Sequence, residues 1–287
     1  MKNSLTSLNI NGSTKINAVI GNPIKHTMSP GMHNKLYSGC NDLNFIYISF
    51  HLEEDELKSF FDIVKTKSFR GVNITVPFKE KVFPYLDKVD LKASNIGAVN
   101  TIVNNNGVLT GYNTDGDGFV FSIREENNYS LKGKTVAILG AGGSAKSIAF
   151  SLLEHKIEKL IILNRTEKKS QDLKQNLNNH YKTDIEVGNL ESYEKLIDSN
   201  LIINTTSIGM DPYIDRSPVK NFEWVSKNHF IYDIIYNPSK TILLKECLKR
   251  GAKIQNGKGM LAAQGMLAHK LFTNNEGSYK LMKSQIV

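Results

Sequence analysis

The sequence predicts an α/β protein with two domains and mostly parallel sheets. Short apolar runs of strand length alternate with amphipathic segments of helix length along almost the whole chain, which is typical of βαβ units. One of these runs leads into a glycine-rich turn and then into an amphipathic helix. A polar, turn-rich stretch near the middle of the chain interrupts the alternation and predicts a boundary between the domains.

The first part of the chain contains three apolar runs, which we expect to form buried, mostly parallel strands. They are "INAVIG" at 16–21, "FIYISF" at 45–50 and "GVNITVP" at 71–77. Before the third run, "EEDELKSFFDIVKT" at 53–66 places apolar residues at helical spacing, with acidic residues in the first turn where the helix dipole favours them. We expect Pro77 to end the third strand and the chain to enter a helix that carries Lys79.

The alternation breaks at 100–115, where "NTIVNNNGVLTGYNTD" predicts two short strands joined by an Asn-Gly turn, as in a β-hairpin. The polar stretch that follows places the domain boundary within 116–133. We therefore expect a first domain over 1–115 and a second over 116–250. The remaining segment, 251–287, contains the apolar stretch "MLAAQGMLAHKLF", and we expect it to form helices that pack back on the first domain.

The second domain is predicted to bind a dinucleotide. Its apolar runs are "TVAILG" at 135–140, "KLIILNR" at 159–165, "NLIINTT" at 200–206 and "HFIYDIIY" at 229–236. The first run leads into Gly140, Gly142 and Ala145 in the spacing G-x-G-x-x-A, and an amphipathic helix follows. Such glycines permit a tight turn that lets a pyrophosphate approach the backbone and the helix N-terminus. The strand, turn, helix and second strand together predict a Rossmann-type domain.

The residues after the second strand of this domain indicate its preferred cofactor. NAD-binding sites usually carry an aspartate or glutamate there, which binds the ribose 2′-hydroxyl. This chain has Asn164, Arg165 and Thr166 instead. Because a guanidinium pairs with a 2′-phosphate through two parallel hydrogen bonds, whereas a carboxylate repels it, we expect NADP(H).

The composition is ordinary for a globular protein and argues against nucleic-acid and membrane binding. The 287 residues carry a formal net charge of +8, but the lysines are scattered among glutamates and form no basic stripe with aromatic residues. No run reaches the roughly 18 apolar residues of a membrane span, and the first residues lack the apolar core of a secretory signal. We expect a cytoplasmic protein whose anionic substrate or cofactor accounts for part of the positive charge.

The cysteines and histidines predict neither a disulfide framework nor a metal site. Cys40 and Cys247 lie far apart in the sequence and outside any C-x-x-C spacing. The seven histidines show no H-E-x-x-H motif and no paired ligand spacing. We therefore expect no metal cofactor.

Three polar segments that follow strands of the first domain are candidates for a binding or catalytic site. In "GNPIKHTMSPGMHN", the hydroxyls of Thr27 and Ser29 lie in a loop with more polar side chains than a simple connection needs. Lys79 follows the third strand, and a lysine that is desolvated beside a carboxylate becomes a positioned proton donor or acceptor. Asp115, after the hairpin, is the candidate carboxylate, although composition alone does not show that the two side chains meet.

The sequence resembles the shikimate dehydrogenases over residues 21–265. Nine segments occur in the order and approximate spacing of that family: "GNPIKHTMSPGMHN", "NITVPFK", "GAVNT", "GYNTDGDG", "GAGGSAKS", "LNRT", "NTTSIGM", "YDIIYNP" and "GKGMLAAQG". Several of them are specific to this family rather than shared by dinucleotide-binding proteins in general. The pairing of "VPFK" with "NTDGDG" is the most specific.

The resemblance implies a role for each matching residue. Lys79 is the catalytic acid and base, and Asp115 pairs with it and touches the ring hydroxyls of the substrate. Thr27 and Ser29 bind the substrate carboxylate. The other implied substrate contacts are Thr75, Asn100, Tyr236 and Gln264. The implied NADP(H) contacts are Gly140, Ala141, Gly142, Gly143, Ser144, Asn164, Arg165, Thr166 and Lys169, with Thr205, Thr206, Ser207, Ile234 and Gly257 near the nicotinamide.

The implied activity is the reversible NADPH-dependent reduction of 3-dehydroshikimate to shikimate, a step of chorismate and aromatic amino-acid biosynthesis, in a cleft between the two domains. The reduced ketone oxygen needs a proton, which a lysine ammonium supplies. A quinate/shikimate dehydrogenase that uses NAD or NADP is the alternative. A non-catalytic NADP-sensing or nucleic-acid-binding protein of the same fold is a more distant one. We expect a monomer or a homodimer.

Overall fold

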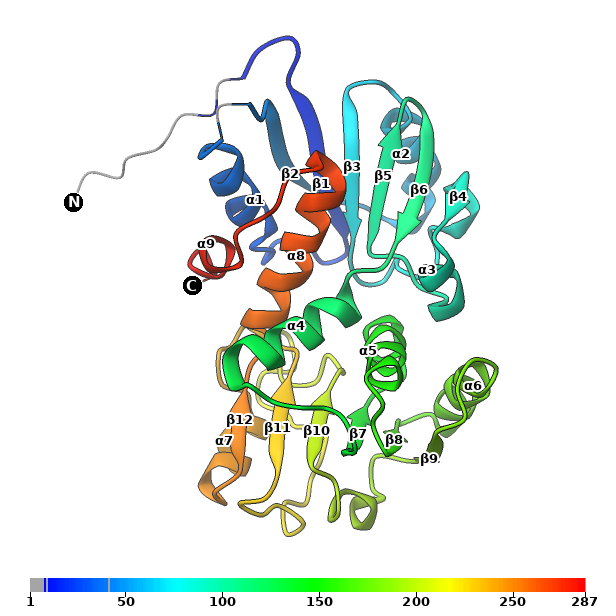
Figure 1. Ribbon diagram of the computed structural model, residues 1–287, viewed down its shortest axis with the longest axis vertical. Coiled ribbons are helices and arrows are strands. Elements are labelled where there is room, and N and C mark those ends of the chain that lie inside the picture. The colour runs from blue at the N-terminus through cyan, green and yellow to red at the C-terminus, as the bar shows by residue number, and fades with distance from the viewer. Residues whose placement is uncertain (1–7, 9, 41, 287) are drawn as a thin grey trace, which may run out of the picture. The chain divides into compact units, whose positions relative to one another are not determined.

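The computed structural model describes residues 8, 10–40 and 42–286, and the chain divides into two compact units (Figure 1). Unit 1 contains the residues up to Gly118 together with those from Ala262 onward, and unit 2 contains Phe119–Leu261. Two helices, α4 (Asp115–Asn127) and α8 (Lys258–Thr273), contain the two points at which the chain passes from one unit to the other. Unit 1 is therefore built from both ends of the chain.

Within the described residues, unit 1 contains a six-stranded sheet in the order β2-β1-β3-β5-β6-β4. The strands are β1 (Lys15–Gly21), β2 (Phe45–His51), β3 (Phe69–Ile74), β4 (Lys88–Val89), β5 (Thr101–Asn105) and β6 (Val108–Tyr112). β1 pairs in parallel with β2 and β3, whereas β5 is antiparallel to β3 and β6. The carboxyl ends of β1, β3 and β6 and the amino end of β5 therefore lie at the same end of the sheet.

The predicted hairpin is present as β5 and β6. Asn106 and Gly107 join the two strands with φ values of 54° and 93°, and positive φ at both central residues is what a type I′ hairpin turn requires. The buried amide of Asn104 supports the turn, because its Oδ1 accepts a hydrogen bond from the Gly107 N–H at 2.7 Å. Its Nδ2 donates to three backbone carbonyls, at Val64, Thr66 and Phe69.

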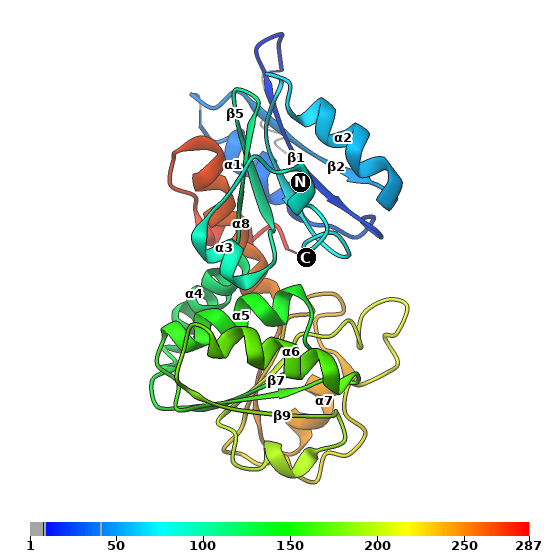
Figure 2. The same ribbon diagram turned by 90° about the vertical axis from the view of Figure 1, so that its right-hand side faces the viewer.

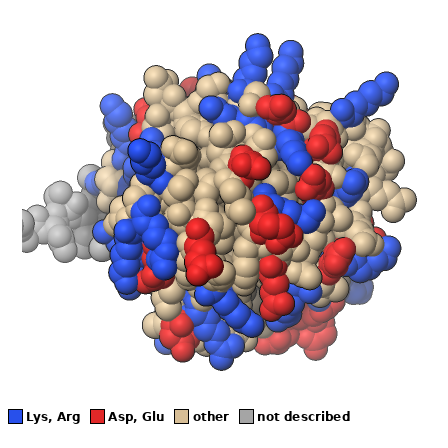
Figure 3. Space-filling view, turned by 90° about the horizontal axis from the view of Figure 1, so that it is seen from below, with Lys and Arg blue, Asp and Glu red and all other residues tan. Residues whose placement is uncertain are grey.

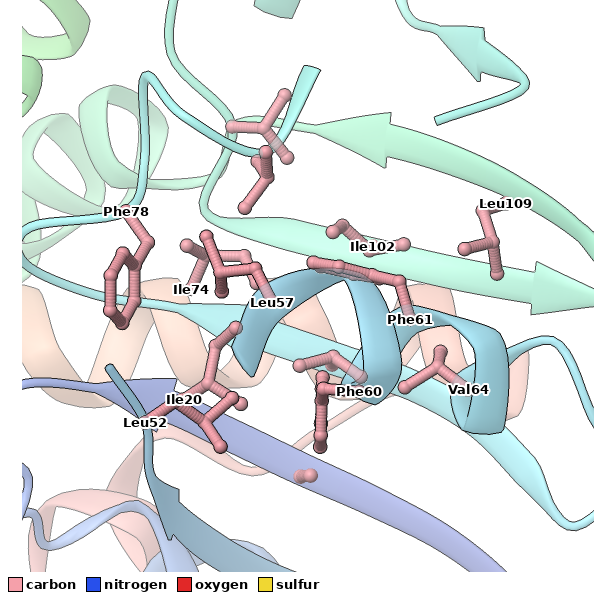
Figure 4. Close-up of a cluster of buried hydrophobic side chains, with 14 of the residues drawn as sticks. Ile20, Leu52, Leu57, Phe60, Phe61, Val64, Ile74, Phe78, Ile102 and Leu109 are labelled. Carbon is pink, nitrogen blue, oxygen red and sulfur yellow. The ribbon is translucent and has the colours of Figure 1, made fainter. Parts of the chain in front are cut away.

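The helix predicted over 53–66 covers one face of the unit 1 sheet. It consists of a 3₁₀ turn (Glu54–Glu56) followed by α2 (Leu57–Val64). Its apolar residues recur every three or four positions, so they share one side of the helix and pack against the strands. Figure 4 labels Leu57, Phe60, Phe61 and Val64 from this helix, and Ile20, Ile74, Ile102 and Leu109 from the sheet. Full burial of each large apolar side chain contributes about 1.5–3 kcal/mol to stability.

Helices α1 (Ser29–Tyr37) and α8 lie on the opposite face of this sheet (Figure 2). Phe272 of α8 packs directly over Gly71 of β3, where any Cβ atom would overlap its ring. Arg70 of β3 donates from Nε to the Phe272 carbonyl oxygen at 2.6 Å. The short helices α3 (Leu91–Ile96) and α9 (Tyr279–Lys283) complete unit 1, and α9 lies beside α1.

The segment after β3 differs from the prediction. Residues 76–81 form turns rather than a helix, so Lys79 lies in a turn, and the only helical residues that follow before α3 are a single 3₁₀ turn, Phe83–Tyr85. Hydrogen bonds from Phe78 N to Thr75 O and from Lys81 N to Phe78 O close the turns. Pro84, which lies in that 3₁₀ turn, lacks the N–H group that an α-helix continuing from Lys79 would need there.

Unit 2 contains a second six-stranded sheet among the described residues, and all of its neighbouring strands are parallel. The strands are β7 (Thr135–Leu139), β8 (Lys159–Leu163), β9 (Asp184–Gly188), β10 (Leu201–Asn204), β11 (Phe230–Asp233) and β12 (Lys253–Gln255). Their order, β12-β11-β10-β7-β8-β9, is that of a doubly wound dinucleotide-binding sheet. The prediction of a Rossmann-type domain is confirmed.

Helices cover both faces of the unit 2 sheet. They are α5 (Gly143–Glu154), α6 (Glu167–Asn178), α7 (Ile242–Lys249) and the larger part of α4. Leu243, Leu244 and Cys247 of α7 pack into a core that includes Ile202 and Ile231 of the strands. On α4, Ser122 hydrogen-bonds the Tyr232 hydroxyl and the Gln255 side chain, both at 3.1 Å.

None of the helices in the described part of the chain combines the length and apolar character needed to cross a membrane. Within the same residues, no group of three or more His, Cys, Asp and Glu side chains is arranged to hold a metal ion. On the face seen in Figure 3, Lys and Arg side chains are interspersed with Asp and Glu side chains.

Candidate active site

The polar residues predicted in the first domain gather at one end of the unit 1 sheet. Thr27 and Ser29 follow β1, Thr75 and Lys79 follow β3, Asn100 precedes β5, and Asp115 follows β6. Because β5 is antiparallel to its neighbours, its first residues lie at the same end of the sheet as the last residues of β3 and β6. Ligands of α/β sheets usually bind beyond the carboxyl ends of the strands.

Lys79 and Asp115 form a largely buried ion pair. Lys79 Nζ lies 2.5 Å from Asp115 Oδ2, and their side chains are 12% and 6% exposed. The Val99 N–H donates to the Lys79 carbonyl oxygen at 2.8 Å and holds the turn that carries the lysine. The fold therefore brings together the two residues whose contact the sequence alone left open. Removing one partner of such a pair would leave the other charge buried without compensation.

Asn100 binds the second oxygen of the same carboxylate. Its Nδ2 donates to Asp115 Oδ1 at 2.8 Å, and its Oδ1 accepts from the Thr114 N–H at 2.8 Å. Gln264, on α8 within unit 1, joins this group through two contacts. Its side-chain Oε1 lies 3.5 Å from Asn100 Nδ2, and its backbone carbonyl oxygen accepts from Thr114 Oγ1 at 3.2 Å. Each Asp115 oxygen thus accepts one of these hydrogen bonds, Oδ2 from the lysine and Oδ1 from the amide, and each keeps further acceptor capacity.

The hydroxyl loop after β1 runs beside the start of the lysine turn. The Asn22 N–H donates to the Val76 carbonyl oxygen at 3.0 Å, and a Cβ at Gly21 would overlap the Thr75 methyl group. Glycine at position 21 therefore lets the two loops approach. Within the hydroxyl loop, Thr27 Oγ1 lies 3.3 Å from Ser29 Oγ, so these two hydroxyls form one polar group.

The glycine turn of unit 2 fits the phosphates of a dinucleotide. Gly140 follows β7 with φ of 115°, a conformation that side chains other than glycine rarely adopt. Gly142 caps the N-terminus of α5 without any side-chain hydrogen bond. A Cβ at Gly142 would meet no atom within 4 Å, so open space lies over the turn. The first backbone N–H groups of α5 thus face a region where an anion can bind.

The residues after β8 fit a 2′-phosphate better than a bare ribose hydroxyl. Asn164 Nδ2 donates to the Thr166 carbonyl oxygen at 2.8 Å, and Thr166 is the N-cap residue of α6. Arg165 and Lys169 are both exposed there. Two cationic side chains at the N-terminus of α6, with no carboxylate among residues 164–166, favour the binding of a doubly negative phosphate group.

Asp233 and Asn204 support the loops of unit 2 that carry predicted cofactor contacts, and the sequence reading missed both. Asn204 Oδ1 accepts from the backbone N–H and the hydroxyl of Thr206, at 3.0 and 2.7 Å. Its Nδ2 donates to Asp233 Oδ1 at 3.0 Å. Asp233 Oδ1 also accepts from the Ile235 N–H at 3.1 Å, and Oδ2 accepts from Thr241 Oγ1 at 2.7 Å. Both side chains are fully buried, so the loops that follow β10 and β11 are held by one polar group.

Asp233 predicts a pH dependence of stability. Burial raises its pKa to about 6, although hydrogen bonds from Thr241, Ile235 and Asn204 act in the opposite direction. The folded state therefore holds this proton more tightly than the unfolded state does. Asp233 therefore adds roughly 3 kcal/mol to the free energy of unfolding below about pH 4. This contribution is lost as the pH rises through about 6.

Chemical unfolding of the wild-type protein and of Asp233→Asn across this pH range measures the contribution. We expect the stability of the wild-type protein relative to the variant to fall as the pH rises from 4 to 7, because asparagine keeps hydrogen bonds but does not titrate. A stability difference that is independent of pH would contradict the assignment.

The remaining predicted contacts of unit 2 lie in the segments that follow β10, β11 and β12. The Gly257 N–H donates to the Ile235 carbonyl oxygen at 3.0 Å, and any Cβ at position 257 would overlap the Ile234 carbonyl group. Thr205 Oγ1 donates to the Leu139 carbonyl oxygen at 2.8 Å, which fixes the loop after β10 to the end of β7. Tyr236 is half-buried, and burial raises the pKa of its phenol, so it stays protonated. Tyr236 belongs to unit 2, whereas the other predicted substrate contacts belong to unit 1.

Two family models match the chain, one in each part. A model described as the shikimate dehydrogenase substrate binding domain matches residues 19–102. A model described as shikimate / quinate 5-dehydrogenase matches residues 122–239.

Curated proteins and solved structures that are named shikimate dehydrogenases match nearly the whole chain. A shikimate dehydrogenase (NADP(+)) of Carboxydothermus hydrogenoformans is 42% identical over 281 residues, which cover 97% of this chain and 99% of that protein. A crystal structure of a shikimate dehydrogenase in complex with NADP+ superposes with a TM-score of 0.90 at 38% identity and covers 96% of both chains. The shikimate 5-dehydrogenase of Thermus thermophilus in complex with NADP(H) and shikimate has a TM-score of 0.85 at 32% identity, over 95% of this chain and 98% of its own.

Proposed function

The chain belongs to the shikimate dehydrogenase family, and we propose that Lys79 and Asp115 are the residues with which it interconverts 3-dehydroshikimate and shikimate. It is an NADP-dependent oxidoreductase, as its relatives are named. The observation that carries the residue assignment is the buried 2.5 Å ion pair between these two side chains at the ligand-binding end of the unit 1 sheet.

Lys79 provides the proton that the reaction needs. Bound NADPH supplies the hydride that reduces the ketone carbon of the substrate. Negative charge then develops on the ketone oxygen, and an ammonium group hydrogen-bonded to that oxygen stabilises it and protonates it. In the direction of shikimate oxidation, the same lysine accepts the hydroxyl proton. One residue therefore acts as the acid in one direction and as the base in the other.

Asp115 orients the lysine and offers an acceptor to a hydroxyl of the substrate ring. Its Oδ2 binds Lys79 and its Oδ1 binds Asn100, so the carboxylate cannot rotate without breaking both contacts. A fixed carboxylate limits the positions that the ammonium group occupies, and such preorganisation lowers the barrier to proton transfer.

The carboxylate of the substrate is proposed to bind the Thr27 and Ser29 hydroxyls. The two oxygen atoms are 3.3 Å apart, so both hydroxyls can donate to one carboxylate when Thr27 turns its proton from Ser29 to the ligand. Thr75, Asn100, Tyr236 and Gln264 complete the proposed set of substrate contacts. The hydroxyl and amide groups of these residues match the hydroxyls of the substrate ring in kind.

The cofactor is proposed to bind unit 2 through the glycine turn and the residues after β8. The backbone of Gly140 to Ser144 would hold the pyrophosphate at the N-terminus of α5. Arg165, with Lys169 nearby, would pair with the 2′-phosphate. Thr205 to Ser207, Ile234 and Gly257 would lie on the nicotinamide side. The cytoplasmic location and the monomeric or homodimeric state predicted from the sequence belong to the same proposal.

A comparison of substrates and cofactors tests the proposed specificity. The rate of reduced-cofactor formation would be measured by absorbance with shikimate and with quinate, each against NADP+ and NAD+. We expect the highest kcat/KM for shikimate with NADP+, because the residues after β8 contain an arginine and no carboxylate. Efficient quinate oxidation with NAD+ would overturn the assignment in favour of a quinate/shikimate dehydrogenase.

A further inference from the structure

Asn73 is a buried amide in the middle of unit 1, and its side chain makes hydrogen bonds from both ends. It lies on β3 opposite Thr101 of β5 and is 7% exposed. Its Oδ1 accepts from the Tyr47 hydroxyl at 2.7 Å. Its Nδ2 donates to the Asn100 carbonyl oxygen at 3.1 Å and to Thr101 Oγ1 at 3.0 Å. A buried amide stabilises a protein less than an apolar side chain of the same shape does, unless all these bonds are satisfied.

The orientation of this amide is fixed by its partners. The Asn100 carbonyl oxygen can only accept a hydrogen bond, so the nitrogen of the Asn73 amide must face it. The oxygen of the amide then faces Tyr47, whose hydroxyl must donate. Burial raises the pKa of Tyr47 well above its ordinary value, so the hydroxyl keeps the proton that it donates.

The fixed amide in turn sets the direction of the next hydrogen bonds. Thr101 Oγ1 accepts from Asn73 and donates its own proton to Asn100 Oδ1 at 2.9 Å. Asn100 Oδ1 is thereby held as an acceptor, together with its bond from the Thr114 N–H, and its Nδ2 is left to face Asp115. A reversed Asn100 amide would place an oxygen against the carboxylate, which is repulsive. The Asn73 amide therefore binds the backbone carbonyl oxygen of Asn100 directly. It holds the side chain of Asn100 indirectly, through the Thr101 hydroxyl.

We propose that Asn73 is a positioning residue for the reaction, which acts by holding Asn100 and, through it, the Asp115 carboxylate that orients Lys79. The proposal rests on the function proposed above. Asn73 itself has no direct hydrogen bond to Lys79 or Asp115 among the described residues, so its effect on turnover must pass through Asn100.

Asn104 provides a matched control, because it is a buried asparagine in the same sheet with no link to the site. It is 3% exposed, and the partners of its amide among the described residues are backbone groups around the hairpin turn, the end of α2 and the start of β3. Leucine at either position removes the hydrogen bonds at nearly constant volume. A purely structural role of Asn73 would make the two variants alike.

The kinetic test compares the wild-type protein with Asn73→Leu, Asn104→Leu and Thr101→Val, each assayed well below its unfolding temperature. We expect Asn73→Leu to lower kcat/KM for shikimate by roughly tenfold or more, as expected for the loss of the two of its three hydrogen bonds that lead to Asn100. The KM for NADP+ should not change, and Asn104→Leu should keep the wild-type rate. Thr101→Val removes only the hydroxyl between Asn73 and Asn100, so it tests the same link if Asn73→Leu does not fold.

A second measurement tests the positioning without any turnover. Hydrogen exchange of the Asn100 side-chain amide would be followed by nuclear magnetic resonance in the substrate-free protein. We expect faster exchange in Asn73→Leu and Thr101→Val than in the wild-type protein and in Asn104→Leu. Unchanged exchange and unchanged kcat/KM in both site variants, or equal effects of the Asn104 control, would overturn the inference. A folded wild-type protein that does not oxidise shikimate would instead refute the proposed function, and the exchange data would still decide the role of Asn73.

Discussion

Replacing Lys79 by methionine is expected to lower kcat for shikimate oxidation by roughly 10²–10⁴-fold, the usual contribution of a positioned acid or base. Methionine has a similar length but carries no proton donor. It also leaves the Asp115 carboxylate, whose side chain is 6% exposed, without its cation. The KM for NADP+ should change little, because the proposed cofactor contacts lie in unit 2. Steady-state rates with saturating NADP+ measure the effect.

Lys81 is the matched control for this substitution. It lies two residues further along the same turn, pairs with Glu54 and is 42% exposed. Lys81→Met changes the charge of the protein by the same amount and is expected to keep the wild-type kcat. If both variants kept the wild-type kcat, Lys79 would not be the proton donor.

Replacing Arg165 by alanine is expected to raise the KM for NADP+ by roughly 10–100-fold, which corresponds to the loss of a charge-assisted hydrogen-bonded pair. The KM for NAD+ should stay nearly constant, because NAD+ has no 2′-phosphate for the guanidinium to bind. Initial rates at varied concentrations of each cofactor give both values. The preference for NADP+ should therefore fall without a comparable change in kcat.

Lys168→Ala is the control for Arg165. Lys168 is an exposed cation in the first turn of α6, where it pairs with Asp172 at 2.8 Å. Its removal changes the net charge equally and should leave both KM values unchanged. Equal losses for NADP+ in the two variants would show a general electrostatic effect of the surface rather than a 2′-phosphate contact.

The sequence predicted most elements whose pattern is local. The strands with long apolar runs, β1, β7 and β8, begin and end within one or two residues of the predicted runs. The β5–β6 hairpin follows from one Asn-Gly pair, because only a few residue types adopt positive φ at both turn positions. Such features depend on residues that are neighbours in the chain.

Elements stabilised by distant partners could not be predicted in the same way. β4 and β12 have two and three residues, and their pairing with β6 and β11 rather than their own composition makes them strands. The helix expected at Lys79 is a set of turns, because backbone bonds to Val99 and Thr75 and a second proline override the local pattern.

For the candidate site, motif resemblance named the groups that we propose to contact substrate and cofactor, but not the residues beneath them. Asn73, Asn204 and Asp233 each hold such a group in place, and each is a buried polar residue that directly follows apolar residues of its strand. A polar residue in that position is costly unless it is hydrogen-bonded, so the pattern itself is a usable signal. Their partners come from other strands, and the sequence offers no means of choosing among them.

The most direct test of the account measures NADP+ reduction by the purified protein with shikimate, for the wild-type protein and Lys79→Met side by side. Absorbance of NADPH reports the rate, and circular dichroism confirms that both proteins are folded. We predict NADPH formation that requires shikimate in the wild-type protein and is at least roughly 100-fold slower in the variant. No NADPH formation by the folded wild-type protein, or equal rates in the two, would contradict the account.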